Sequence, residues 1–152
     1  MLGSVLGATA VATALALGPG GPTGAAERAD PLEGLTVHPE WGSITGRPGV
    51  LRKGCRTYHY DYSISPPEGV WAIEVHISGP GLESLAAGAF LDGYDPTTGT
   101  GHYTLCRNST RYGRFTIRAK LSVDDGSGHI TEGLLPVDHY RLHRPHRHRP
   151  HR

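Results

Sequence analysis

The side chains with the clearest capacity for chemistry are histidines, of which this 152-residue chain has ten. Four of them lie in the sequence HRPHRHRPHR: His143, His146, His148 and His151. Neutral imidazoles at such short intervals can bind zinc, nickel or copper. The arginines between them repel a cation, and Pro145 and Pro150 interrupt any regular element. We therefore favour a disordered basic tail over a metal site.

A second histidine pair follows from strand pairing. If the two cysteines lie opposite each other on antiparallel strands, the same register places His59 opposite His102. Two imidazoles on a sheet surface can bind one metal ion weakly or form a pH-sensitive contact, with Asp61 or His76 as a further ligand nearby. Neighbouring surface histidines more often have no such role, so this pair is the weaker of the two metal-site candidates.

Nothing in the sequence selects a catalytic site. No Gly-x-Ser-x-Gly elbow and no Cys-x-x-Cys pair are present. The acidic segments 92–95 and 124–126 lack the alternating ligands and distal Glu of an EF-hand loop, and Asp and Gly are ordinary turn residues. We expect a protein that is not an enzyme and has no cofactor, with zinc, nickel or copper in the tail as the alternative.

Charge is distributed unevenly, although the net charge is only +1. Residues 30–140 carry 9 Lys or Arg against 13 Asp or Glu, whereas residues 141–152 carry five Arg and no acid. An acidic body with a basic tail favours contact with an anionic cell-wall polymer or another surface protein. No motif for specific nucleic-acid recognition accompanies the charge.

The N-terminal segment has the features of a signal peptide. Residues 2–17 are apolar and uncharged, and the sequence GPGGP and then Ala25-Ala26 follow them. This is the order of a secretory apolar region and a small-residue cleavage site, although no Lys or Arg precedes it. The apolar run is short for a membrane span. We predict a signal peptide over 1–26, secretion, and no transmembrane span in the mature form.

Short alternating segments with turns between them predict strands. Apolar residues share one face over 57–65, 71–77 and 115–123, with polar residues on the other. Weaker segments cover 86–91 and 102–106. A last strand, divided by Pro136, runs from Ile130 to Leu142. No window has helical periodicity free of Gly or Pro.

About seven such strands predict an all-β sandwich of the immunoglobulin or fibronectin type III kind, with a small closed barrel as the alternative. We expect a polar lead-in over 27–42, the sandwich over 43–143 and the disordered His/Arg-rich tail over 144–152. Edge strands of an open sandwich can pair between copies, so we expect a monomer or a weak dimer.

Secretion makes a disulfide between Cys55 and Cys106 the default. In such a sandwich the second and fifth strands are antiparallel neighbours, which places the two cysteines opposite each other. Both cysteines alternate in step with the polar residues of their strands, so the bridge is expected on the outer face or at the sheet edge. Closing this loop stabilises the fold by about 4 kcal/mol in the chain-entropy model.

Three alternating tyrosines, Tyr58, Tyr60 and Tyr62, have two interpretations. An exposed tyrosine ladder is a platform on which sugars stack. If Trp71 and Phe115 mark the inner faces of the two sheets, however, the tyrosines belong to the core, where each hydroxyl needs a hydrogen-bond partner. We favour the core.

Several segments together carry a family resemblance. They are Gly54-Cys55, the Tyr58–Tyr62 run, Pro66-Pro67, Trp71, Gly79-Pro80-Gly81, Leu105-Cys106-Arg107 and Gly113–Ile117. Over residues 43–143 the chain resembles small secreted proteins of actinobacteria that have a single immunoglobulin-like sandwich domain. The resemblance implies export and this fold, and it provides no catalytic residues. The resulting prediction is a secreted, non-enzymatic binding or cell-surface-associated module; the alternative is a histidine-dependent metal-binding protein that uses the tail.

Overall fold

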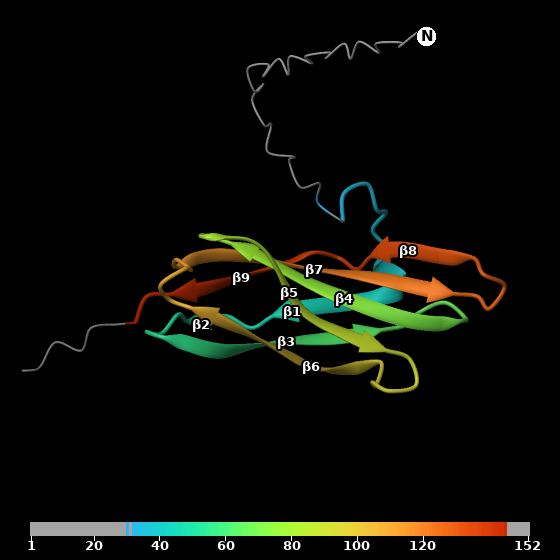
Figure 1. Ribbon diagram of the computed structural model, residues 1–152, viewed down its shortest axis with the longest axis horizontal. Coiled ribbons are helices and arrows are strands. Elements are labelled where there is room, and N and C mark those ends of the chain that lie inside the picture. The colour runs from blue at the N-terminus through green and yellow to red at the C-terminus, as the bar shows by residue number, and fades with distance from the viewer. Residues whose placement is uncertain (1–29, 31, 146–152) are drawn as a thin grey trace, which may run out of the picture.

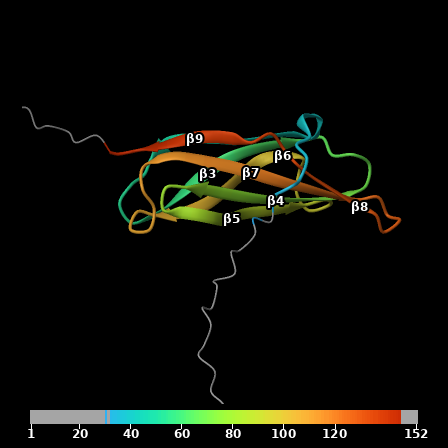
Figure 2. The same ribbon diagram turned by 90° about the horizontal axis from the view of Figure 1, so that it is seen from above.

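The computed structural model describes residue 30 and residues 32–145, which form two packed β-sheets (Figures 1 and 2). One sheet has the strand order β1 (Gly42–Gly46), β3 (Cys55–Ile64) and β6 (Thr98–Cys106). The larger sheet has the order β2 (Gly49–Val50), β9 (Asp138–His143), β7 (Gly113–Asp124), β4 (Val70–Gly79) and β5 (Leu82–Leu91). Strand β8 (Ile130–Leu134) also pairs with β7, and a 3-10 turn, η1 (Pro39–Trp41), precedes β1.

The nine strands differ from the predicted segments in two places: the last segment is divided near Pro136, as expected, and β1 and β2 precede residue 57, where the first strand was predicted. Strands β8 and β9 pair antiparallel with successive parts of β7, and the residues between them include Pro136, which has no amide hydrogen to donate. Strand β1 belongs to the smaller sheet, while β2, a few residues later, pairs with β9 of the larger one. The predicted immunoglobulin-like sandwich with one disulfide is confirmed. None of the described residues forms a helix long and apolar enough to cross a membrane.

Alternating side chains of both sheets fill the core, as the period of two predicts. Strand β4 contributes Trp71, Ile73, Val75 and Ile77, and β7 contributes Phe115, Ile117, Ala119, Leu121 and Val123. All nine are buried. The described residues before β1 also pack on the sandwich, because Leu32 and Trp41 are buried there.

Two of the three tyrosines on β3 belong to the core, as the sequence predicts, whereas Tyr58 is only half-buried at its edge. Tyr60 and Tyr62 are buried, and their hydroxyls donate to the carbonyl oxygens of Ala87 (3.1 Å) and Pro96 (3.0 Å). Their partners on β6 are Gly101 and Gly99. A Cβ on Gly101 would overlap the Tyr60 ring, so the glycines make room for the tyrosines.

Two strands begin four residues earlier than the sequence analysis placed them. Strand β6 starts at Thr98, although the sequence analysis placed its start at residue 102. The alternation of apolar and polar residues is not visible there, because Gly99 and Gly101 occupy inward-facing positions and tyrosine rings of β3 fill the space. Strand β5 starts at Leu82 rather than at residue 86. The pairing of β5 with β4 shifts register between Val75 and His76, so the inward-facing residues have even numbers in one part of β5 and odd numbers in the other. This bulge weakens the alternating apolar pattern in the sequence.

Candidate functional site

The disulfide fixes one end of the smaller sheet. Cys55 and Cys106 are direct partners on β3 and β6, and their Cα atoms are 3.9 Å apart. The amide of Arg107 donates to the carbonyl of Gly54 (3.0 Å), so the cysteines form a non-hydrogen-bonded pair, in which opposed residues lie closest. The separation is therefore shorter than the usual range for a bridge. Cys55 is exposed and Cys106 half-buried, which confirms a bridge outside the core.

The same register brings His59 and His102 together as direct partners on the outer face of the smaller sheet. Both are exposed. Asp61 lies two residues along the same face, where Arg47 and the Thr100 hydroxyl donate hydrogen bonds to it. These bonds lower the pKa of Asp61 to about 2. Its carboxylate is therefore already engaged by a cation beside the histidine pair.

The remaining histidine candidates lie elsewhere. His76 is on β4 of the opposite sheet, 3.9 Å from Glu74, and does not join His59 and His102. His143 is exposed at the end of β9, and His146, His148 and His151 lie outside the described residues. Over residues 30 and 32–145, no group of three or more His, Cys, Asp or Glu side chains is arranged to hold a metal ion.

The most distinctive polar feature is a concentration of cations at the disulfide end, which we call the basic end. It comprises eight residues: Arg52, Lys53, Arg56, Arg107, Arg111, Arg114, Arg141 and Arg144. Strands β3 and β7 begin there, while β6 and β9 finish there (Figure 1). Direct partners such as Gly113 and Leu142, or Val50 and His143, place these strand ends side by side.

These eight cations have no acidic partner within the described part of the chain. Its Arg and Lys ion pairs involve Arg47, Arg118 and Lys120, which lie away from the basic end. Glu83, at the start of β5, also lies at this end, but it is paired with none of the eight. The basic end therefore carries a large uncompensated positive charge.

Two arginines are opposed directly across the sheet. Arg114 on β7 and Arg141 on β9 are register partners, both exposed, and they line a shallow groove of about 300 Å³ with His139 and Tyr140. Like charges at directly opposed positions destabilise a sheet. The pairing of Arg114 with Arg141 is therefore unfavourable for the stability of the larger sheet.

An aromatic side chain organises further cations of the basic end. The guanidinium carbon of Arg107 lies 4.1 Å from the centre of the Tyr112 ring, and that of Arg144 lies 5.5 Å from it. Arg107 also donates to the carbonyl of Thr110 (2.9 Å). Hydrogen bonding to Arg107, together with the charge of both arginines, lowers the pKa of Tyr112. Cation–π contacts hold these guanidinium groups without neutralising them.

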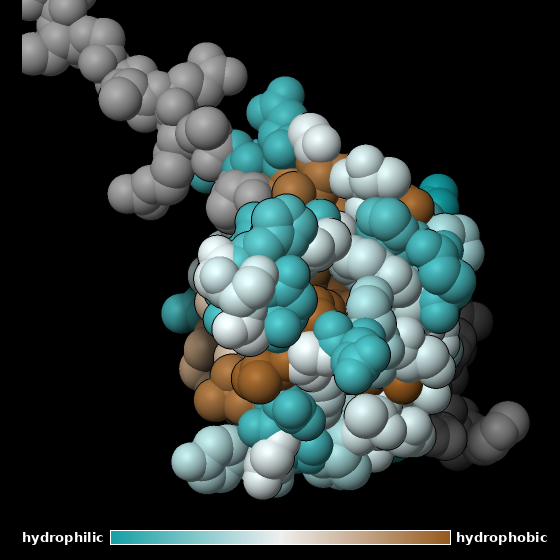
Figure 3. Space-filling view, turned by 90° about the vertical axis from the view of Figure 1, so that its right-hand side faces the viewer, coloured by the Kyte–Doolittle hydropathy of each residue, from teal (hydrophilic) through white to brown (hydrophobic). Residues whose placement is uncertain are grey.

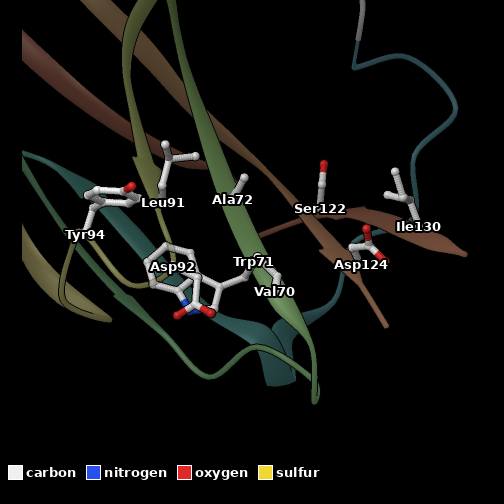
Figure 4. A pocket seen from close by; sticks show the side chains of 9 residues that line it. All are labelled: Val70, Trp71, Ala72, Leu91, Asp92, Tyr94, Ser122, Asp124 and Ile130. Atoms are coloured by element: carbon white, nitrogen blue, oxygen red, sulfur yellow. The ribbon is translucent and has the colours of Figure 1, made fainter. Parts of the chain in front are cut away.

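The opposite end of the sandwich has a contrasting surface, which we call the acidic groove. It is about 360 Å³ in volume and lies across the larger sheet (Figure 4). Its lining residues are Val70, Trp71, Ala72, Leu91, Asp92, Tyr94, Ser122, Asp124 and Ile130. Tyr94 is 89% exposed and Val70 64%. Figure 3, which faces this end, shows hydrophobic surface among polar side chains.

Sequence reasoning found the disulfide and the histidine pair but missed both ends of the molecule. A usable signal was present, because residues 57–106 contain six acids and no Lys or Arg. Cations occur in three separate stretches, 47–56, 107–120 and 141–152, together with Arg28 near the N-terminus. Only the antiparallel topology shows that most of those stretches meet at one end.

Comparison with protein-family models and with curated proteins finds no match for this chain.

Proposed function

We propose that the protein is a secreted, non-enzymatic binding module whose basic end attaches to an anionic cell-wall polymer. The observation that carries the proposal is the set of eight cations at one end of the sandwich, none with an acidic partner among the described residues. Phosphate and carboxylate groups of a polyanion would supply the missing counter-charges. Guanidinium groups suit this role, because two N–H donors of one planar group can bind two oxygens of the same phosphate or carboxylate.

The opposed arginines add support from energetics. Selection for stability alone would not place two arginines at the directly opposed positions 114 and 141, since their repulsion is unfavourable. A bound anion between them would turn that repulsion into attraction. Arg147, Arg149 and Arg152 continue the basic sequence beyond β9 and would add to the same charge.

The test is binding to purified cell wall at increasing salt concentration. We expect binding of the unmodified protein to fall steeply as salt rises, because exposed charges are screened. An Arg114→Gln/Arg141→Gln variant should bind about tenfold or more weakly, as expected for losing two charge contacts. The matched control, Arg47→Gln/Arg118→Gln, removes the same charge from arginines that are already ion-paired, and should retain binding.

Two outcomes would contradict the proposal. One is equal loss of binding in the test and control variants, which would mean that net charge alone matters. The other is undiminished binding to cell wall from which the anionic polymer has been chemically stripped. That result would assign the attachment to another component, such as a surface protein.

A further inference from the structure

Side chains of four strands form the acidic groove. Val70 and Ala72 of β4, Leu91 of β5, Asp124 of β7 and Ile130 of β8 lie on the outer face of the larger sheet. Ala72 is opposed by Leu91 on one side and Ser122 on the other. Because alanine is shorter than the flanking Val70 and Leu91, the middle of this face is hollowed.

The groove combines apolar walls with free negative charge. Four of the six large apolar side chains exposed in the described part of the chain lie in it: Val70, Leu91, Tyr94 and Ile130. Asp92 and Asp124 are at its rim, and neither forms an ion pair with a described residue. Exposed apolar surface beside unpaired carboxylates suits a cationic ligand with apolar or ring-bearing residues.

The chain itself contains a segment with that chemistry. Residues 144–152, RPHRHRPHR, have four Arg, three His, two Pro and no acid. Proline disfavours helix and favours an extended backbone, which can lie along a groove and stack on a tyrosine. Its arginines complement Asp92 and Asp124 in charge and can also stack on Tyr94.

The distance from the end of β9 to the groove determines whether the segment can come from the same molecule or must come from a second copy of the chain. Leu142, just before it, is the register partner of Gly113 at the start of β7, whereas the groove lies at Ser122 and Asp124 near the end of that strand. Figure 2 shows β8 and the end of β9 at opposite ends of the sandwich. From Gly113 to Asp124 a strand spans about 36 Å at ~3.3 Å per residue. The ten residues that follow Leu142 reach at most about 33–36 Å when fully extended, which brings only the last of them to the groove, so the segment cannot lie along the groove of its own sandwich.

We propose that the acidic groove binds the basic segment 144–152 of a second copy of the chain. The two contacting surfaces differ and lie at opposite ends, so the contact is head-to-tail. Contacts of this kind repeat and generate open chains of molecules rather than closed dimers. The association rises with protein concentration and weakens with salt.

Sedimentation velocity tests this on protein that retains residues 144–152. The unmodified protein should form a concentration-dependent series of oligomers at low salt. A groove variant, Asp92→Asn/Asp124→Asn, and a segment variant, Arg147→Gln/Arg149→Gln/Arg152→Gln, should each associate about tenfold or more weakly. The matched control Glu33→Gln/Glu83→Gln removes two exposed acids outside the groove and should associate normally.

Mixing the two variants separates this contact from general charge attraction. The groove variant keeps an intact segment and the segment variant keeps an intact groove, so an equimolar mixture should form dimers that do not grow further. A mixture that stays monomeric overturns the proposal, as does unmodified protein that is monomeric at every concentration. If only the groove variant loses association, the occupant is another part of the second copy and the assignment to residues 144–152 is wrong.

The same variants distinguish this proposal from cell-wall attachment. Substitutions in the acidic groove leave the basic end unchanged, so they should abolish chain formation without weakening attachment to cell wall. Loss of both properties in the groove variant would show that the ends do not act separately, and would overturn the inference.

Discussion

The two ends of the sandwich differ in charge, in hydropathy and in what holds them together. The basic end gathers eight cations around a disulfide, whereas the acidic groove has exposed apolar side chains and carboxylates beside hairpin turns. A net charge of +1 thus conceals an uneven distribution, with eight cations at one end and Asp92 and Asp124 in the groove at the other. Net charge says little about what such a protein binds, because the topology sorts charges by strand end.

The two ends of the sandwich also differ in their hydrogen bonds. Near the basic end the hydroxyls of Tyr103 on β6 and Tyr140 on β9 are 2.6 Å apart and join the two sheets through the core. Near the groove, turn hydrogen bonds hold the chain: Asp95 accepts from the amide of Leu91, and Asp124 accepts from that of Gly126. The basic end therefore has a disulfide and a hydrogen bond between the sheets in addition to its strand pairing, while the groove end combines strand pairing with turn hydrogen bonds.

The largest expected effect comes from removing the disulfide. A Cys55→Ser/Cys106→Ser variant should lose about 4 kcal/mol of unfolding free energy, because the link closes a loop with a sequence separation of 51. Denaturant unfolding measures the change. Hydrogen exchange should show faster opening at the ends of β3 and β6 than at the groove. Equal acceleration at both ends would contradict the view that the bridge serves the basic end.

The buried hydroxyl pair predicts a loss of stability at alkaline pH. Burial raises the pKa of Tyr103, and it raises that of Tyr140 to about 12. A tyrosine of the unfolded chain titrates near pH 10, so this contribution is complete below about pH 10 and is lost as pH rises toward about 12. Unfolding free energy measured across this range should fall. In a Tyr103→Phe/Tyr140→Phe variant the fall should be smaller, and an unchanged slope would contradict the assignment.

How much the sequence could predict depends on whether neighbours in the chain carry the signal. Register followed from local alternation and one cysteine pair, so the pairing of His59 with His102 is confirmed. The start of β6 was missed because Gly99 and Gly101 have a role only once tyrosine rings of another strand cover them. The basic end was missed for the same reason, since Arg114 and Arg141 are distant in sequence and meet only through strand pairing.

A smaller effect concerns the opposed arginines. An Arg141→Gln variant should be more stable than the unmodified protein by about 0.2–0.5 kcal/mol, because it removes a like-charge pair across the sheet. The gain should shrink as salt rises. Denaturant midpoints at two salt concentrations measure both effects. An Arg47→Gln variant is the control and should show no gain, since Arg47 is paired with Asp61. A loss of stability in Arg141→Gln would mean that Arg114 and Arg141 do not repel each other.

The smallest effect on stability is expected at the acidic groove. Leu91 is 49% and Ile130 59% exposed, so a Leu91→Ser/Ile130→Thr variant should keep its unfolding free energy within about 0.5 kcal/mol. If these side chains form a binding surface, the same variant should associate with other copies more weakly in sedimentation velocity, because burying apolar area drives association. Ile73→Ala provides the contrast: this residue is 1% exposed on the inner face of β4, and its truncation should cost about 2–5 kcal/mol. A groove variant that loses comparable stability would make Leu91 and Ile130 part of the folding core, and the distinction between a cross-linked end and a contact end would fail.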